Sequence, residues 1–219
     1  MGKGAFAALG TAGAGGLGAG GLIALKPWQS TPDEAPITSI RSKYPSALLN
    51  LEGDVNIWEK KYKALETKTP HHPTLQKALS TGKGTGANLT EAKSLLKSGC
   101  RAIYESDSDN SNNFQDFKSF CSKTNEDATK SGKQWIADAT SKADGNKWDT
   151  VLTSLKGHNT WSLDSVLETL KKGVQGDSSS FPEARRKELK DWCDKAKLEV
   201  FVGESSSEFQ SQEAFCKAD

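Results

Sequence analysis

The apolar residues in the first long polar stretch of the chain recur at helical spacing. Trp58, Tyr62 and Leu65 are separated by four and three residues. This spacing places their side chains on one face of an α-helix. Asp54 precedes them and belongs to the residue types that favour the N-cap position. The sequence therefore predicts a helix that follows Asp54 and ends before residues 69–73, where two prolines interrupt it.

The same spacing predicts further helices along the rest of the chain. An Asn88–Glu91 pair has the spacing of a capping box, and Ser162 is expected to cap a later helix. Residues 199–202 form the only strand-like run. The predicted helical segments are 92–104, 114–121, 151–156 with a stop at Gly157, 166–171 with a stop at Gly173, and 183–198.

The first 26 residues follow a different pattern. Residues 4–25 carry no charge and consist almost wholly of Gly, Ala and Leu. At about 1.5 Å per residue, a helix of this length spans the roughly 30 Å hydrocarbon core of a bilayer. We therefore expect residues 1–26 to form an N-terminal transmembrane helix in the plasma membrane, in contact with the lipid bilayer through residues 4–25.

Two alternatives to a simple anchor stay open. A cleaved signal peptide would use Lys3 as its basic start and the small residues 19–21 as its cleavage site. The most apolar run, residues 22–25, follows that site instead of preceding it, which favours a retained anchor. Gly16 and Gly20 have the small-xxx-small spacing that allows membrane helices to associate. Chance matching in a glycine-rich stretch is the simpler interpretation of this spacing.

Prolines and charge divide the remainder of the chain. Four prolines between positions 27 and 45 interrupt any regular helix there, so residues 27–46 are predicted to form a stalk. Residues 47–219 are predicted to form a small all-α domain, and the fold class is therefore mostly α. The 29 Lys and Arg nearly balance the 28 Asp and Glu. Bulk charge thus gives no attraction for nucleic acid.

The cysteines indicate the compartment. All four lie beyond the predicted anchor, and none forms a C-x-x-C motif. Four cysteines allow three disulfide connectivities, and four buried free thiols are the alternative. Disulfides persist outside the reducing cytosol, so the cysteines favour an extracytoplasmic position for residues 47–219. Pairing by proximity in sequence would join Cys100 to Cys121 and Cys193 to Cys216.

Motifs for chemistry are incomplete throughout the sequence. Asp107 begins a run of oxygen-bearing residues, but Lys118 stands where a calcium-binding loop has its bidentate Glu. His71 and His72 are adjacent and flanked by prolines, and His158 stands alone, so no zinc-ligand spacing results. We therefore predict no catalytic residue, no cofactor and no metal, and a protein that is not an enzyme.

The whole layout resembles the uncharacterised paralogous surface and membrane proteins of haemotropic mycoplasmas. Members of that group combine a Gly/Ala-rich apolar N-terminus, a Lys-rich polar body and an L-K-x-W-C element. Residues 1–25 and 189–193 carry the first and last of these features here, and Trp58-x-x-x-Tyr62 also fits. The resemblance implies a protein that faces the host, with antigenic variation as one reason for its expansion. It implies no known enzyme activity and transfers no functional residue.

These observations favour a single-pass, membrane-anchored surface protein with a non-catalytic role. Host interaction, with a host surface protein as partner, and antigenic display both fit that role. A secreted binding module, released by signal cleavage, is the first alternative. A membrane-bound hydrolase is the second, and it requires a polar cleft with a histidine or a pair of carboxylates.

Overall fold

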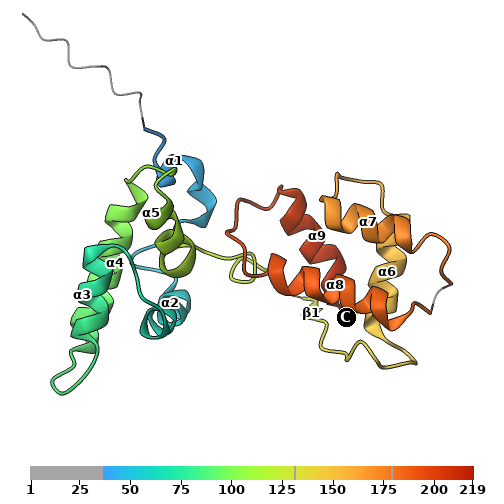
Figure 1. Ribbon diagram of the computed structural model, residues 1–219, viewed down its shortest axis with the longest axis horizontal. Helices are drawn as coiled ribbons and strands as arrows, with labels where there is room; N and C mark the ends of the chain where they lie inside the picture. The colour runs from blue at the N-terminus through green and yellow to red at the C-terminus, as the bar shows by residue number, and fades with distance from the viewer. Residues whose placement is uncertain (1–36, 131, 179) are drawn as a thin grey trace, which may run out of the picture. The chain divides into compact units, whose positions relative to one another are not determined.

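The computed structural model describes residues 37–130, 132–178 and 180–219, and it is mostly helical (Figure 1). Two short strands, β1 (Gln134–Trp135) and β2 (Lys217–Ala218), pair antiparallel. The predicted mostly-α fold class is confirmed. The helical elements are α1 (Ile40–Lys43), the 3-10 turn η1 (Pro45–Ala47), α2 (Val55–Thr67), α3 (Pro73–Thr81), α4 (Leu89–Tyr104), α5 (Ser111–Asp116), the π-helical turn η2 (Phe117–Cys121), α6 (Lys147–Gly157), α7 (Ser165–Gly173), α8 (Glu183–Ala196) and α9 (Ser207–Phe215).

The predicted membrane anchor, residues 1–26, lies outside the described residues, together with Gly16 and Gly20. Within the part that the structure describes, no helix has the length and apolar character needed to cross a bilayer.

The buried apolar residues of residues 37–219 form two separate clusters. One is built from α1, η1, α2, α3, α4 and η2 together with Val200, and the other from β1 and α6 to α9. We call residues 47–123 the N-terminal module and residues 134–218 the C-terminal module. Each module thus has a hydrophobic core, and Val200 of the C-terminal module packs into the core of the N-terminal module.

The two modules repeat one structural plan. Each has four successive helical segments, of which the fourth in the N-terminal module is α5 continued by η2. Each also has a disulfide from the third segment to the end of the fourth, and buried residues at matching positions along the segments. This repeat was not predicted from the sequence. The matching buried pairs are Trp58 and Trp148, Tyr62 and Leu152, Leu65 and Leu155, Leu75 and Leu167, Ala78 and Leu170, Leu96 and Leu189, Cys100 and Cys193, Phe120 and Phe215, and Cys121 and Cys216.

Local contacts repeat as well. The indole Nε1–H of Trp58 donates to the carbonyl of Asn50 at 2.9 Å, and that of Trp148 donates to the carbonyl of Asp138 at 2.9 Å. The residue after the last cysteine pairs, in both modules, with the segment before the first helix. These antiparallel partners are Leu48 with Ser122, and Trp135 with Lys217.

Both disulfides join the cysteines that are neighbours in sequence. Cys100 of α4 is bonded to Cys121 of η2, with Cα atoms 5.2 Å apart. Cys193 of α8 is bonded to Cys216, which follows α9, with Cα atoms 5.6 Å apart. The pairing by proximity is therefore confirmed, and the alternative of four free thiols is wrong.

Two side chains that were predicted to cap helices make no capping hydrogen bond. Asp54 stands at the N-cap of α2, but its backbone φ is 52° and its side chain does not cap. Its carboxylate instead accepts the N–H of Asn50 at 2.7 Å and pairs with Lys123 at 3.1 Å. Ser162 does not cap α7, because that helix starts later. Asp164 caps it and accepts the first N–H groups of the helix at 2.9 and 2.8 Å.

Helix α3 was not predicted, since the surrounding prolines look like interruptions. Pro73 occupies the first turn, where its missing N–H has no partner to lose. His72 caps the helix through its ring Nδ1, which accepts from Thr74 N at 3.3 Å. The carboxylate of Asp116, which is 1% exposed, accepts the backbone N–H groups of His71 and His72.

Two further segments differ from expectation. The predicted strand at 199–202 contributes only an isolated bridge, between Val200 and Thr124. The predicted stalk is partly packed, because Ile40 is 0% exposed and its N–H donates to the carbonyl of Ser106 at 2.9 Å. The boundary at residue 47 therefore lies inside the packed unit, which begins by Ile40.

Asn125, in the segment between the modules, is bound to the C-terminal module through hydrogen bonds. It is 1% exposed, and its backbone N–H donates to the carbonyl of Glu199 at 2.9 Å. Its side-chain Nδ2 donates to the carbonyl of Ala196 at 2.9 Å and to Glu208 Oε1 at 2.6 Å. Gln212 Nε2 donates to the carbonyl of Asn125 at 3.3 Å. Both N–H groups of this side chain are thus used, and its Oδ1 is buried without a hydrogen-bond partner among the described residues.

Removal of either disulfide should destabilise the protein. Each bond closes a loop of just over 20 residues, with sequence separations of 21 and 23. Loop-closure entropy then corresponds to about 3 kcal/mol of unfolding free energy for each bond. Urea unfolding of the paired serine variants C100S/C121S and C193S/C216S should show losses of similar size. A loss confined to one pair would contradict the equivalence of the modules.

The Glu208 carboxylate should make stability depend on pH. Burial, helped by the nearby Glu199 and Asp164 carboxylates, raises the pKa of Glu208 above its usual value of 4.5, despite the hydrogen bond from Asn125. An acid with a raised folded pKa contributes stability that is lost as pH rises through that pKa. Glu208→Gln should therefore raise the urea midpoint at pH 7, and the gain should shrink towards pH 4. A gain that does not change with pH would exclude ionisation as its cause.

Candidate functional site

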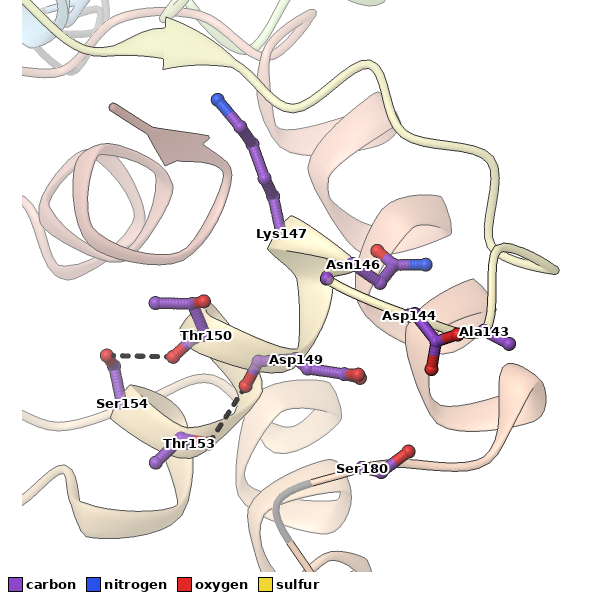
Figure 2. Close-up of a pocket in the computed structure, with 10 residues that line it drawn as sticks. Ala143, Asp144, Asn146, Lys147, Asp149, Thr150, Thr153, Ser154 and Ser180 are labelled. Carbon is purple, nitrogen blue, oxygen red and sulfur yellow. Dashed lines mark hydrogen bonds between the residues drawn. The ribbon is translucent and has the colours of Figure 1, made fainter.

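One hollow in the C-terminal module is polar. It has a volume of about 650 Å³ and surrounds the first turns of α6 (Figure 2). Its lining residues are Ala143, Asp144, Gly145, Asn146, Lys147, Asp149, Thr150, Thr153, Ser154 and Ser180.

Several polar groups of this hollow are already bound within the module. Asn146 Oδ1 accepts the N–H of Trp148 at 3.0 Å. The hydroxyls of Thr153 and Ser154 donate to helix carbonyls four residues earlier, at 2.8 and 3.2 Å, as the dashed lines in Figure 2 mark. These groups serve the helix itself, which leaves them poorly placed for a ligand.

Asp149 and Arg186 form a buried ion pair beside the same hollow. Arg186 Nε lies 2.7 Å from Asp149 Oδ1, and Nη2 lies 2.8 Å from Oδ2. Arg186 is 4% exposed, and its Nη1 also donates to the carbonyls of Thr140 and Lys142. This arrangement ties the 139–146 loop to α6 and α8, so the polar hollow is a by-product of the packing.

The second hollow is an apolar groove between α7 and α8. Its volume is about 500 Å³, within the range of sites that bind small ligands or side chains. Its floor is apolar and its rim carries charges. We call it the α7/α8 groove, and its lining residues are Ser165, Val166, Thr169, Leu170, Glu188, Asp191, Trp192 and Lys195.

Trp192 is the central side chain of the α7/α8 groove. Its indole Nε1–H donates to Asp164 Oδ2 at 2.6 Å. The other oxygen of Asp164 caps α7, so the indole is fixed to the start of that helix. Trp192 is 7% exposed, whereas Val166 across the groove is 53% exposed. The groove therefore combines a fixed aromatic wall with an accessible aliphatic one.

At the matching place of the N-terminal module, α4 lies directly against α3. Gly99 of α4 matches Trp192, because Gly99 precedes Cys100 as Trp192 precedes Cys193. A Cβ added at Gly99 would lie 2.7 Å from Leu75 Cδ2 and 3.4 Å from the side chain of Thr74. Helices α3 and α4 are thus in close contact, which a larger side chain at Gly99 would prevent.

Two of the three apolar groove residues, Trp192 and Leu170, are larger than their counterparts in the N-terminal module, and Val166 replaces a polar Thr of similar size. Bulkier residues hold α7 and α8 apart where α3 and α4 touch. This difference makes the α7/α8 groove the candidate functional site. The three matching pairs are Gly99 and Trp192, Thr74 and Val166, and Ala78 and Leu170.

The predicted chemistry residues do not converge. His71 and His72 lie in the N-terminal module, and their backbones are bound by Asp116. His158 is 8% exposed, and its ring Nε2 lies 2.9 Å from the carbonyl of Trp161. Asp107 Oδ1 accepts the N–H of Asp109 in a surface turn. Within the described ranges, no group of His, Cys, Asp or Glu could hold a metal ion.

The sequence did not identify the groove residues as a site. Trp192 is typical of a core residue and is largely buried, so its pattern predicts packing. The one available signal was the comparison of both halves of the chain, aligned on their Phe-Cys elements at residues 120–121 and 215–216. Comparison with protein-family models, curated proteins and solved structures finds no match.

The Asp149–Arg186 ion pair has a counterpart at the matching positions of the N-terminal module, and the two pairs should differ in their effect on stability. Asp149→Asn leaves a nearly buried Arg186 without its charge partner, which should cost about 3 kcal/mol. Glu59 and Lys93 form the matching pair at 2.6 Å, with side chains 45% and 39% exposed. Glu59→Gln should therefore cost less than about 1 kcal/mol. Urea unfolding of both variants measures the contrast, and equal losses would contradict the assignment.

Proposed function

We propose that this chain is a membrane-anchored surface protein that acts outside the cytosol through binding or antigenic display, without catalysis. The two buried disulfides carry the proposal. One closes each module, and all four cysteines are at most 3% exposed. Structural disulfides of this kind belong to oxidising compartments.

The apolar run at residues 4–25 supports an anchor, and the two disulfides formed by the cysteines beyond it support an outward orientation of the modules. The modules would then face the exterior, where a host surface protein is the expected partner. Cleavage after residue 21 would give a secreted form of the same binding module. Mass spectrometry of the mature N-terminus distinguishes the two forms.

Binding is favoured over hydrolysis by the character of the α7/α8 groove. Its apolar lining residues are Val166, Leu170 and Trp192, and their side chains carry no reactive groups. The Thr169 hydroxyl donates to the carbonyl of Ser165 at 2.7 Å within the helix. His158, the buried histidine of the C-terminal module, contacts backbone and aromatic rings.

Protease access on intact cells tests the orientation. With a tag fused after Asp219, external protease should remove the tag and leave a short membrane-protected fragment. Maleimide labelling of the denatured protein should modify the four cysteines only after reduction, because both bonds are formed in the cell. A tag that survives until lysis, together with cysteines that react without reduction, would place the modules in the cytosol and overturn the proposal.

A further inference from the structure

We propose that the α7/α8 groove docks a short segment of a partner protein that presents a large apolar side chain next to a basic one. The inference rests on the proposed function, because it names the partner chemistry for a non-catalytic binding surface. It is carried by the size, the apolar floor and the charged rim of the groove.

The apolar floor points to an inserted apolar side chain. Val166 is 53% exposed on one wall, and the indole of Trp192 forms the other. Trp192 is fixed by its bond to Asp164, so the groove is formed before a ligand arrives. A preformed apolar groove binds without the entropy cost of ordering its own walls.

The rim supplies charge complementarity. Glu188 and Asp191 lie three residues apart on α8, and Lys195 lies one turn further on. The lining residues themselves carry two carboxylates and one ammonium, and Arg185 and Lys187 lie beside the two carboxylates. The residues matching Glu188 and Asp191 in the N-terminal module are Leu95 and Ser98, which are uncharged. The acidic rim is therefore particular to the module that has the open groove.

The carboxylates of the rim can accept an incoming basic group. Glu188 is paired with Arg185 at 3.1 Å, and Asp191 with Lys187 at 2.6 Å. Both pairs lie on the exposed surface of one helix, where such pairs contribute little free energy. A Lys or Arg from a partner can join or replace them at small cost, and the neighbouring indole adds an attraction for cations.

The size of the groove favours a short segment over a second copy of this chain. Its eight lining residues enclose about 500 Å³. A stable interface between two proteins buries roughly 1,200–2,000 Å² and involves about 20–30 residues on each side. The groove is much smaller than that and suits one or two inserted side chains.

Nuclear magnetic resonance of the full chain tests the proposal directly. The indole N–H signal of Trp192, assigned with Trp192→Phe, reports on the groove. Three synthetic helical 12-residue peptides serve as probes, built from Leu and Lys, from Leu and Glu, and from Ser and Lys. The Leu/Lys peptide should shift the Trp192 signal and leave that of Trp148 unchanged. The other two peptides lack the charge or the apolar group and should produce no shift.

Variants separate groove binding from general attraction. Val166→Thr restores the residue type of the N-terminal module on an exposed position, and it should weaken binding about fivefold. Its control is Val55→Thr, at a valine that is 64% exposed on α2. Replacement of Glu188 and Asp191 by Gln and Asn should weaken binding about tenfold.

A second control matches the change in charge. Glu105→Gln with Asp109→Asn removes two surface carboxylates that are also ion-paired, with Arg41 and Lys43, but in the N-terminal module. This double variant should bind the Leu/Lys peptide as the wild type does. Equal weakening by both double variants would indicate general electrostatic attraction and would overturn the proposal.

Other outcomes contradict the proposal in different ways. Binding of the Leu/Lys peptide without a shift at Trp192 would place the peptide elsewhere. Concentration-dependent self-association that Val166→Thr abolishes would make a second copy the occupant of the groove. If the Leu/Lys peptide does not bind the groove but the modules face outward, the docking proposal is wrong and the proposed function stands. A cytosolic location would remove the proposed function even if the peptide binds.

Discussion

The covalent link between the third helix and the end of the fourth is the constraint on which each module depends. A module of about 80 residues buries a small core, and cores of that size often need a covalent support. In both modules the linked cysteine follows a buried Phe, so the bond also holds an aromatic side chain in the core. The next residue then pairs with the strand or bridge before the first helix. One bond therefore fixes the last helix and brings the two ends of the module together.

Several other contacts repeat around this link, although their surroundings differ. Each first helix carries a buried Trp followed by an acid, and each third helix supplies the basic partner of that acid. In the N-terminal module the pair of Glu59 and Lys93 is half exposed. In the C-terminal module the matching pair is covered, because Arg186 also binds carbonyls of the 139–146 loop. The same topology thus tolerates a weak surface pair or a costly buried one.

The local part of this fold could be predicted from the sequence, and the long-range part could not. Helical spacing around Trp58, Tyr62 and Leu65 was sufficient for α2, and proximity in sequence was sufficient for both disulfides. Helix α3 depends on Asp116, which lies more than 40 residues away and binds the backbone of His71 and His72. No local pattern contains that contact.

The groove could not be predicted either, because Trp192 is mostly buried and has the sequence pattern of a core residue. The physical meaning of Trp192 appears only beside Gly99, its counterpart in the closed module. Both residues precede the cysteine of the third helix, and both face the second helix of their module. A glycine there lets the helices touch, and an indole holds them apart. Both modules share the disulfide, the buried Trp of the first helix and the antiparallel pairing after the last cysteine. These shared contacts account for the common fold. Leu170 and Trp192 belong both to the core of the C-terminal module and to the lining of the groove, so the side chains that complete this core also keep α7 and α8 apart.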